Sequence, residues 1–185
     1  MSYTAQSLVN DTYERLKTAN PQIPPTVIPR LEIMVQSALR ALPVFVREKL
    51  GTVEAEIYRK NYTVALSAGQ GSLAAHTDLT SEPMIASEIV KVTHPDAITS
   101  VNSTGKLFRI EGESKLNLVR SEEFGYYAVE DNTLYTVLGN DRTALGGNAT
   151  VRAAYPPLIA NVKFSHEPLL LEMMIGLAQG APNAA

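Results

Sequence analysis

The chain has 185 residues, a formal net charge of −3, 45% hydrophobic and 19% charged residues, and no cysteine. The missing cysteine excludes disulfides, thiol catalysis and cysteine-ligated zinc, and the absence of a long basic run disfavours strong nucleic-acid binding. No apolar run reaches the length of a membrane span and no signal-peptide pattern opens the chain, so we expect a soluble protein made in the cytoplasm, with no membrane partner.

The length predicts a single domain over 1–185, with a helical layer over 1–51, a β-rich region over 52–157, and a spacer, helix and flexible tail over 158–185. Apolar residues on one face predict a first helix over 3–18. A second helix is expected from Thr26, with Pro29 in its first turn and an end near Gly51. Pro43 lies inside this pattern and is expected to kink or split the helix.

Residues 52–155 alternate runs of β-branched and aromatic residues with turn residues, which is typical of antiparallel strands. The pair Asp131-Asn132 predicts a tight hairpin, and Glu111–Ser114 predicts a second one. The glycines of Ser67–Ser72 indicate a hairpin turn and not a phosphate loop, because no lysine follows. The strands are expected at Ile57–Leu66, Glu88–Thr93, Leu107–Glu111, Leu116–Val119, Tyr126–Glu130, Thr133–Leu138 and Ala149–Tyr155.

The last helix is expected to begin at Pro168 and is apolar on nearly every side. Such a helix has to be buried on all faces. Two arrangements would achieve this: docking on the core of its own chain, or cover completed by a neighbouring copy or another protein. The apolar residues are Leu169, Leu170, Leu171, Met173, Met174, Ile175, Leu177 and Ala178.

No set of residues assembles into an acid–base or nucleophilic constellation, so we expect a protein that is not an enzyme and needs no cofactor or metal. His76, His94 and His166 are interpreted as surface or capping histidines. His76 and Asp78 would face the same way on a strand, which gives a hydrolase site as a remote alternative.

Aromatic residues alternate with polar ones in the β-rich region, and half-buried sheet positions are the simpler explanation. The alternative is a carbohydrate-binding β-sandwich that uses Tyr62, Tyr126 and Tyr127 to stack against sugars.

Four segments, in order along most of the chain, resemble the head-to-tail adaptor (connector) proteins of tailed bacteriophages. The first is the helical stretch 28–42, and the second is Tyr62–Gln70 followed by Asp78-Leu79 and 89–92. The third is the hairpin 126–137, and the fourth is Ala149–Pro157 followed by Glu167-Pro168-Leu169. The Pro156-Pro157 pair and the spacer 158–164 depart from the family pattern.

The resemblance implies a structural subunit of the phage neck that joins the portal to the tail. It implies a homo-oligomeric ring, commonly of twelve copies, with a portal protein on one side, a downstream neck or tail protein on the other, and a passage for DNA. Another neck or tail-completion protein, such as a stopper, is the alternative within the virion. The family's use of its C-terminal segment to grip the portal places a partner interface at Leu169, Leu170, Met173, Met174, Leu177, Gln179, Pro182 and Asn183.

A passage that lets DNA slide is expected to be neutral or mildly acidic, which the net charge of −3 permits. The acids on predicted turns are the candidates for facing it: Glu111, Glu113, Glu122 and Glu123. The expected fold is α+β: N-terminal helices, an antiparallel β-sandwich or small barrel, and a C-terminal helix that packs on the N-terminal helices.

Overall fold

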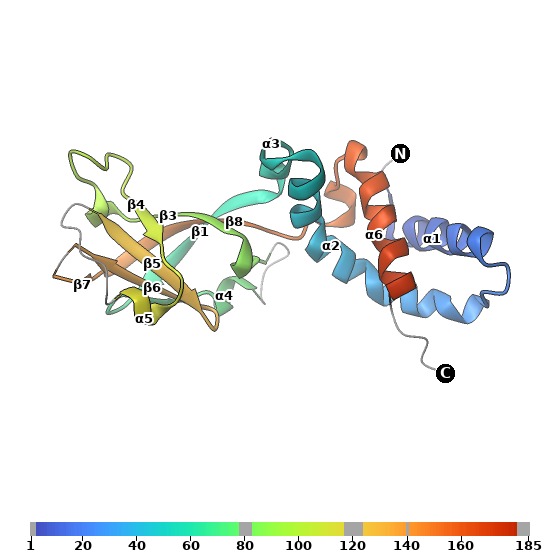
Figure 1. Cartoon of the computed structure of the whole chain (residues 1–185), viewed down its shortest axis with the longest axis horizontal. Coiled ribbons are helices and arrows are strands. Elements are labelled where there is room, and N and C mark those ends of the chain that lie inside the picture. The colour runs from blue at the N-terminus through green and yellow to red at the C-terminus, as the bar shows by residue number, and fades with distance from the viewer. Residues whose placement is uncertain (1–2, 78–82, 117–123, 140, 181–185) are drawn as a thin grey trace. The chain divides into compact units, whose positions relative to one another are not determined.

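The computed structural model describes residues 3–77, 83–116, 124–139 and 141–180, and it has an α+β fold, as the sequence predicts (Figure 1). Internal contacts divide the chain into two compact units. Unit 1 combines Met1–Tyr58 with Tyr155–Ala185, and unit 2 is Arg59–Ala154. The strands that the structure describes, β1 to β8, all lie in unit 2, and the expectation of a single domain stays a prediction.

Unit 1 begins with α1 (Ala5–Ala19), which is opened by a capping box. The Ser7 N–H donates to the Thr4 hydroxyl at 3.1 Å, and the Thr4 N–H donates to the Ser7 hydroxyl at 2.9 Å. These two bonds satisfy N–H groups that a helix start otherwise leaves without partners. The predicted boundaries of 3–18 are therefore correct to within two residues.

The second helix, α2 (Ile28–Leu50), follows a short 3₁₀ turn at Pro25–Val27 and runs unbroken through Pro43. The expectation that Pro43 splits the helix is wrong. Its ring is buried among the apolar residues of α2, whose packing offsets the one missing backbone hydrogen bond. The helix ends at Gly51, which adopts φ of 93°, and α3 (Thr52–Ala55) and a 3₁₀ turn at Glu56–Tyr58 follow.

The C-terminal helix, α6 (Glu167–Gly180), packs against both α2 and α1, which confirms the predicted packing on the N-terminal helices. The core of unit 1 forms where these three helices and the segments beside them meet. Its buried apolar members are Leu8, Val9, Leu16, Leu31, Val35, Ala38, Leu39, Leu42, Val46, Ala55, Tyr58, Val162, Leu170 and Met174.

The described residues of unit 2 form one sheet of eight strands in the order β1-β8-β3-β4-β5-β6-β2, with β7 paired to β6. Every pair is antiparallel except β4–β5, which is parallel. The strands are β1 (Arg59–Leu66), β2 (Gln70–Ser72), β3 (Ile89–Thr93), β4 (Lys106–Arg109), β5 (Gly125–Glu130), β6 (Thr133–Leu138), β7 (Thr143–Ala144) and β8 (Gly147–Ala154).

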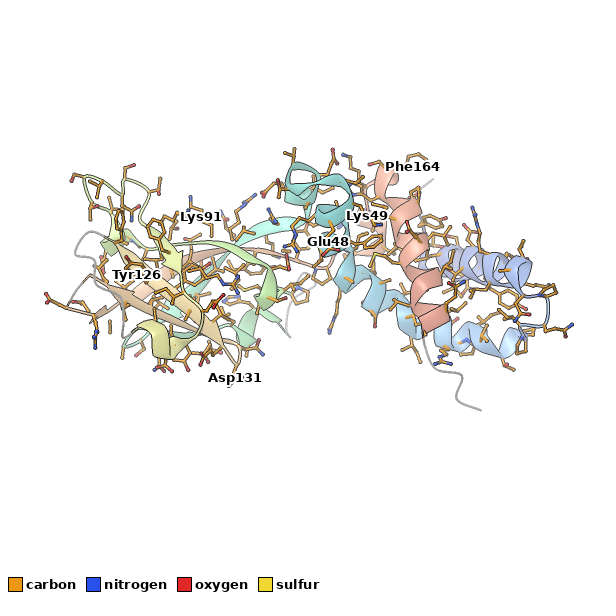
Figure 2. All side chains as sticks on the ribbon, in the orientation of Figure 1. Glu48, Lys49, Lys91, Tyr126, Asp131 and Phe164 are labelled. Carbon is orange, nitrogen blue, oxygen red and sulfur yellow. The ribbon has the colours of Figure 1, made fainter. Side chains whose placement is uncertain are left out.

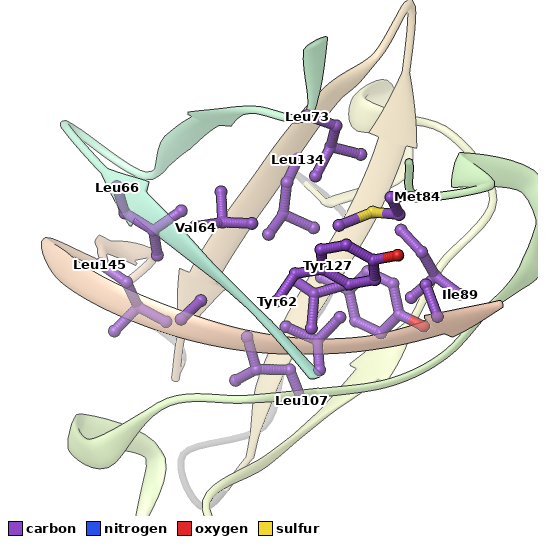
Figure 3. Close-up of a cluster of buried hydrophobic side chains, with 14 of the residues drawn as sticks. Tyr62, Val64, Leu66, Leu73, Met84, Ile89, Leu107, Tyr127, Leu134 and Leu145 are labelled. Carbon is purple, nitrogen blue, oxygen red and sulfur yellow. The ribbon is translucent and has the colours of Figure 1, made fainter. Parts of the chain in front are cut away.

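The sheet curls around a single apolar cluster (Figure 3). Alternating burial along β1 places Tyr62, Val64 and Leu66 on the inner face, as the period of two of a strand requires. Tyr127 and Leu134 reach the same cluster from β5 and β6.

Two expectations for this region are wrong. Glu111–Ser114 does not close a hairpin, because β4 pairs with β5 in parallel. Leu116 ends the short helix α5 (Glu113–Leu116) and does not begin a strand, while residues 117–119 lie outside the described residues. The Asp131-Asn132 hairpin is confirmed, with φ of 47° and 60° at its two residues.

The turn at Ser67–Gln70 is also confirmed, with Ala68 and Gly69 both at positive φ. The short strands β2 and β7 have no clear sequence signal. β2 contains Gly71, where a Cβ would come within 2.7 Å of Val64 Cγ1, so close approach of the chains explains the glycine there.

Candidate interaction surface on the C-terminal helix

The start of α6 is held by the N-terminal segment of the chain. The Tyr3 N–H donates to Glu167 Oε1 at 3.0 Å, and the Glu167 side chain is buried. Glu167 is the first residue of α6, where a carboxylate also interacts favourably with the helix dipole. The predicted start at Pro168 is therefore correct to within one residue.

The helix is covered unevenly within its own chain. Leu170 and Met174, one turn apart, have no exposed surface, whereas Leu177 is 38% exposed. Complete burial of the helix by its own chain is therefore ruled out for the described residues. The remaining apolar side chains are only partly buried: Leu169, Leu171, Met173, Ile175 and Ala178.

Of the residues expected at a partner interface, Leu170 and Met174 belong to the core of unit 1 and are not accessible. Leu169, Met173 and Leu177 follow each other at four-residue spacing, so they share one side of α6. Leu169 and Met173 are partly buried against the core of unit 1, and Leu177 is exposed; we call these three residues the uncovered face of α6. Gln179 is exposed near the end of the helix, and Pro182 and Asn183 lie outside the described residues.

A polar cluster joins the segment before α6 to the end of the N-terminal helices, with Tyr58 and His166 buried and Lys163 and Glu54 partly exposed. The Tyr58 hydroxyl lies 2.8 Å from His166 Nδ1, and the Lys163 N–H donates to the same hydroxyl at 3.3 Å. Lys163 Nζ pairs with Glu54 Oε2 at 2.6 Å. Side chains from two distant parts of the sequence therefore meet in one cluster. No motif or spacing in the sequence predicts this contact.

The electrostatics of this cluster keep His166 neutral. Burial lowers the pKa of His166, and the nearby Glu54 carboxylate opposes this only in part. His166 Nε2 lies 3.3 Å from Glu54 Oε2 without the geometry of a hydrogen bond. The hydrogen bond and charge of Lys163 lower the pKa of Glu54, so this carboxylate stays ionised. The interpretation of His166 as a surface histidine is wrong, because its side chain is fully buried.

A groove with a mixed polar and apolar lining lies at the other end of α6. It has a volume of about 330 Å³, and its apolar lining comes from the end of α1, the following loop, the start of α2 and Ala178. Polar groups of Asn20, Gln22, Arg30 and Gln179 also line it. Polar and apolar groups therefore contribute to the lining of the groove in similar measure.

Two of the four acids expected to face a DNA passage lie among the described residues. Glu111 and Glu113 are both exposed, and the Glu113 N–H donates to Glu130 Oε1 at 2.8 Å, which joins the start of α5 to the end of β5. Asp131 on the adjoining turn is exposed as well; we call these four carboxylates the acidic part of unit 2, although Arg109 on β4 and Lys115 in α5 lie in the same segment. Glu122 and Glu123 lie outside the described residues.

The other two candidate histidines, His76 and His94, do not lie together in one site. His76 lies in the short helix α4 (Ala74–Thr77) and not on a strand, with its ring 5.8 Å from that of Tyr62, and Asp78 lies outside the described residues. His94 is a capping histidine, as expected, since its Nδ1 accepts from the Asp96 N–H at 3.2 Å; it is buried rather than on the surface.

The three tyrosines of the carbohydrate-binding alternative do not form one platform. Tyr62 and Tyr127 are buried in the core of unit 2, while Tyr126 lies on the opposite face of the sheet. On that face its ring is 6.1 Å from Phe108, which in turn packs edge-on against Phe124 at 5.1 Å.

Within the described ranges, no group of three or more His, Asp or Glu side chains has the arrangement of a metal site. The helices of this same part of the chain include none with the length and apolar character needed to cross a membrane. Protein-family models give no match to this sequence, and no curated protein matches it.

Proposed function

We propose that this chain is a structural subunit of a bacteriophage neck, a ring-forming adaptor that joins the portal to the tail and leaves a passage for DNA. The chain then acts through its surfaces and not through a catalytic centre. The observation that carries the proposal is the uncovered face of α6.

The uncovered face contrasts with the opposite side of α6, which is fixed in the core of unit 1. Its two core residues, Leu170 and Met174, are completely buried, and Glu167 ties its start to Tyr3. Yet Leu169 and Met173 are only half-buried, and Leu177 is exposed. Full burial of an exposed side chain of this kind contributes about 1.5–3 kcal/mol. Leu169 and Met173 are already half-buried, so a partner that covered the face would gain only a part of that amount for each residue.

The acidic part of unit 2 is compatible with the same function. Carboxylates at Glu111, Glu113 and Glu130 repel the phosphates of DNA, so DNA beside them would slide without being held. This supports a passage for DNA more than a DNA-binding surface.

The experiment replaces Leu177 with Asp in a phage genome that encodes the chain. Leu177 is exposed, so the variant is expected to fold, while the charge would prevent an apolar contact with a partner. We expect filled or leaking heads without tails. Removal of residues 169–185 is expected to give the same particles, but it also removes Leu170 and Met174 from the core, so the point variant is the sharper test.

Ile33→Asp provides the matched control, because Ile33 is 76% exposed on α2 and is not part of the uncovered face. Its particles are expected to be tailed and infectious. Tailed, infectious particles from Leu177→Asp would contradict the proposal. Imaging the position of the chain in wild-type virions separates an adaptor from a stopper or tail-completion protein.

A further inference from the structure

His166, the residue before α6, is fully buried against groups that α3 and the following 3₁₀ turn supply. Its Nδ1 lies 2.8 Å from the Tyr58 hydroxyl, and its Nε2 lies 3.3 Å from Glu54 Oε2. Among the described residues, the charged and titratable groups that face the ring are Tyr58, Glu54 and Lys163, and Lys163 is paired with Glu54. The carboxylate of Glu167, the next residue along the chain, bonds to the N-terminal segment instead.

The hydrogen bonds of this cluster run in one direction. The Lys163 N–H donates to the Tyr58 hydroxyl, which leaves the proton of that hydroxyl to be donated to His166 Nδ1. The neutral imidazole then carries its proton on Nε2, which faces the Glu54 carboxylate. The other tautomer would leave the Tyr58 O–H without an acceptor among the described residues, and would turn the lone pair of Nε2 toward a carboxylate.

A second proton on His166 does not fit this arrangement. It has to bind at Nδ1, toward which the Tyr58 proton already points. The Tyr58 oxygen accepts from Nδ1 only if its own proton turns away, into a buried site with no further acceptor in the described part of the chain. Burial also lowers the pKa of His166, and the Lys163 charge acts in the same direction while Glu54 opposes both. The protonated ring is therefore more stable in water than in its native site.

The 3₁₀ turn Phe164–His166 is held mainly by this histidine, which is its one buried residue. Phe164 is 73% exposed (Figure 2), and Ser165 is exposed as well. The helices have their own anchors, since Leu170 and Met174 fix α6 in the core and α1 packs on α2. Opening of the turn therefore exposes little apolar surface and costs less than unfolding of unit 1.

We propose that His166 is an acid-sensitive latch: when its ring takes up a proton, the turn Phe164–His166 separates from Tyr58 and Glu54 while the helices of unit 1 stay folded. This inference goes beyond the neck function and does not depend on it. It also differs from a general loss of stability, because the opening is confined to the segment that enters α6. In the open state both ring nitrogens reach water, and Phe164 loses its fixed position.

Amide hydrogen exchange of the full chain, followed by NMR, measures this opening. The Lys163 N–H bonds to Tyr58 across the latch and reports its opening, while the Ala38 N–H in the middle of α2 reports unfolding of unit 1. A histidine in water has a pKa of about 6.5, so a proton that binds only in the open state favours opening about tenfold between about pH 7.5 and about pH 5.5. After correction for intrinsic exchange rates, we expect the protection of Lys163 to fall about five- to tenfold, with Ala38 at least about tenfold better protected at both pH values.

Two variants and one spectrum complete the test. His166→Asn retains an acceptor near the position of Nδ1 but does not titrate, so the protection of Lys163 is expected to change less than about twofold over the same range. His76→Gln, which removes a half-buried histidine of unit 2, is the control and is expected to keep the wild-type change. The ¹⁵N spectrum of labelled histidine side chains at about pH 7.5 is expected to show His166 protonated on Nε2.

The proposal is overturned if His166 carries its proton on Nδ1 at neutral pH, or if the wild-type protection of Lys163 changes less than about twofold. Equal protection of Lys163 and Ala38 would overturn it too, because unit 1 would then open as a whole. An equal pH dependence in His166→Asn and the wild type would place the responsible proton elsewhere. If His166→Asn fails to fold, the tautomer and the two wild-type amides still decide the question.

Discussion

Tyr58 and His166 are joined by a hydrogen bond of 2.8 Å although 108 residues separate them in the sequence. Both side chains are buried, and their rings lie 5.5 Å apart. This bond connects the end of the N-terminal helices to the segment that enters α6. It therefore sets where α6 begins, and with it the positions of Phe164 and of the uncovered face.

Replacement of Tyr58 by Phe tests the energetic role of that bond. The variant leaves His166 Nδ1 and the Lys163 N–H without their partner in a buried site, so we expect the free energy of unfolding to fall by about 1–3 kcal/mol. Urea unfolding followed by circular dichroism measures it. Tyr155→Phe is the control, because the Tyr155 hydroxyl bonds to the Ile57 carbonyl oxygen at an exposed site, and a change within about 0.5 kcal/mol is expected.

The stability of unit 1 is expected to decrease as the pH falls below about 6.5, the ordinary pKa of histidine. Burial lowers the pKa of His166 in the folded state, so the unfolded chain binds a proton first, and protonation favours unfolding. The stability that the neutral histidine contributes is complete above that pH and is lost as the pH falls toward the lower folded-state pKa.

Urea unfolding measured at several pH values between 5 and 7.5 gives this dependence, and His166→Gln supplies the comparison. The glutamine amide does not titrate, so the loss of stability in this pH range is expected to be smaller in the variant. An equal pH dependence in both proteins would show that His166 does not cause it. Glu54, whose pKa is lowered, affects stability only at more acidic pH.

Two substitutions on α6 separate its core side from its uncovered face. Met174→Ala removes a fully buried side chain, and we expect a loss of about 2–5 kcal/mol. Leu177→Ala truncates an exposed side chain and is expected to cost less than about 1 kcal/mol. Denaturant unfolding of the two variants measures the difference, and equal losses would mean that Leu177 is as covered as Met174.

Gly69 tests the turn between β1 and β2. Its φ of 77° is unfavourable for a residue with a side chain, and a Cβ there would lie 2.6 Å from the Thr136 carbonyl oxygen. We expect Gly69→Ala to destabilise unit 2 by more than the roughly 1–2 kcal/mol of the left-handed conformation alone. Gly146→Ala, where nothing lies within 4 Å of the added carbon, is the control in a thermal unfolding comparison, and a similar Tm for both would contradict the turn geometry.

The local parts of the fold were predictable from the sequence, because they depend on neighbouring residues. The periodic apolar residues of α1 and α2, and the Asp131-Asn132 turn, each gave elements near their observed bounds. The parallel pairing of β4 with β5 was not predictable, since no nearby turn fixes it. The continuation of α2 through Pro43 was not predictable, because the cost of the proline depends on packing with residues distant in the sequence.

The same distinction applies to the candidate surface. The apolar composition of α6 pointed to a contact with a partner, but the sequence did not separate Leu170 and Met174, which are buried, from Leu177, which is not. The cluster of Tyr58 and His166 and the groove near Gln179 both join segments from opposite ends of the chain. Local sequence patterns do not predict contacts between segments so far apart, so these two features are seen only in the folded structure.

The position and surroundings of α6 in an assembled particle provide the most direct test, and electron cryo-microscopy of virions measures both. A ring of this chain is expected between portal and tail, with Leu169, Met173 and Leu177 covered by a neighbouring protein. A virion that lacks the chain, or a ring in which these three side chains stay exposed to solvent, would contradict the proposed role.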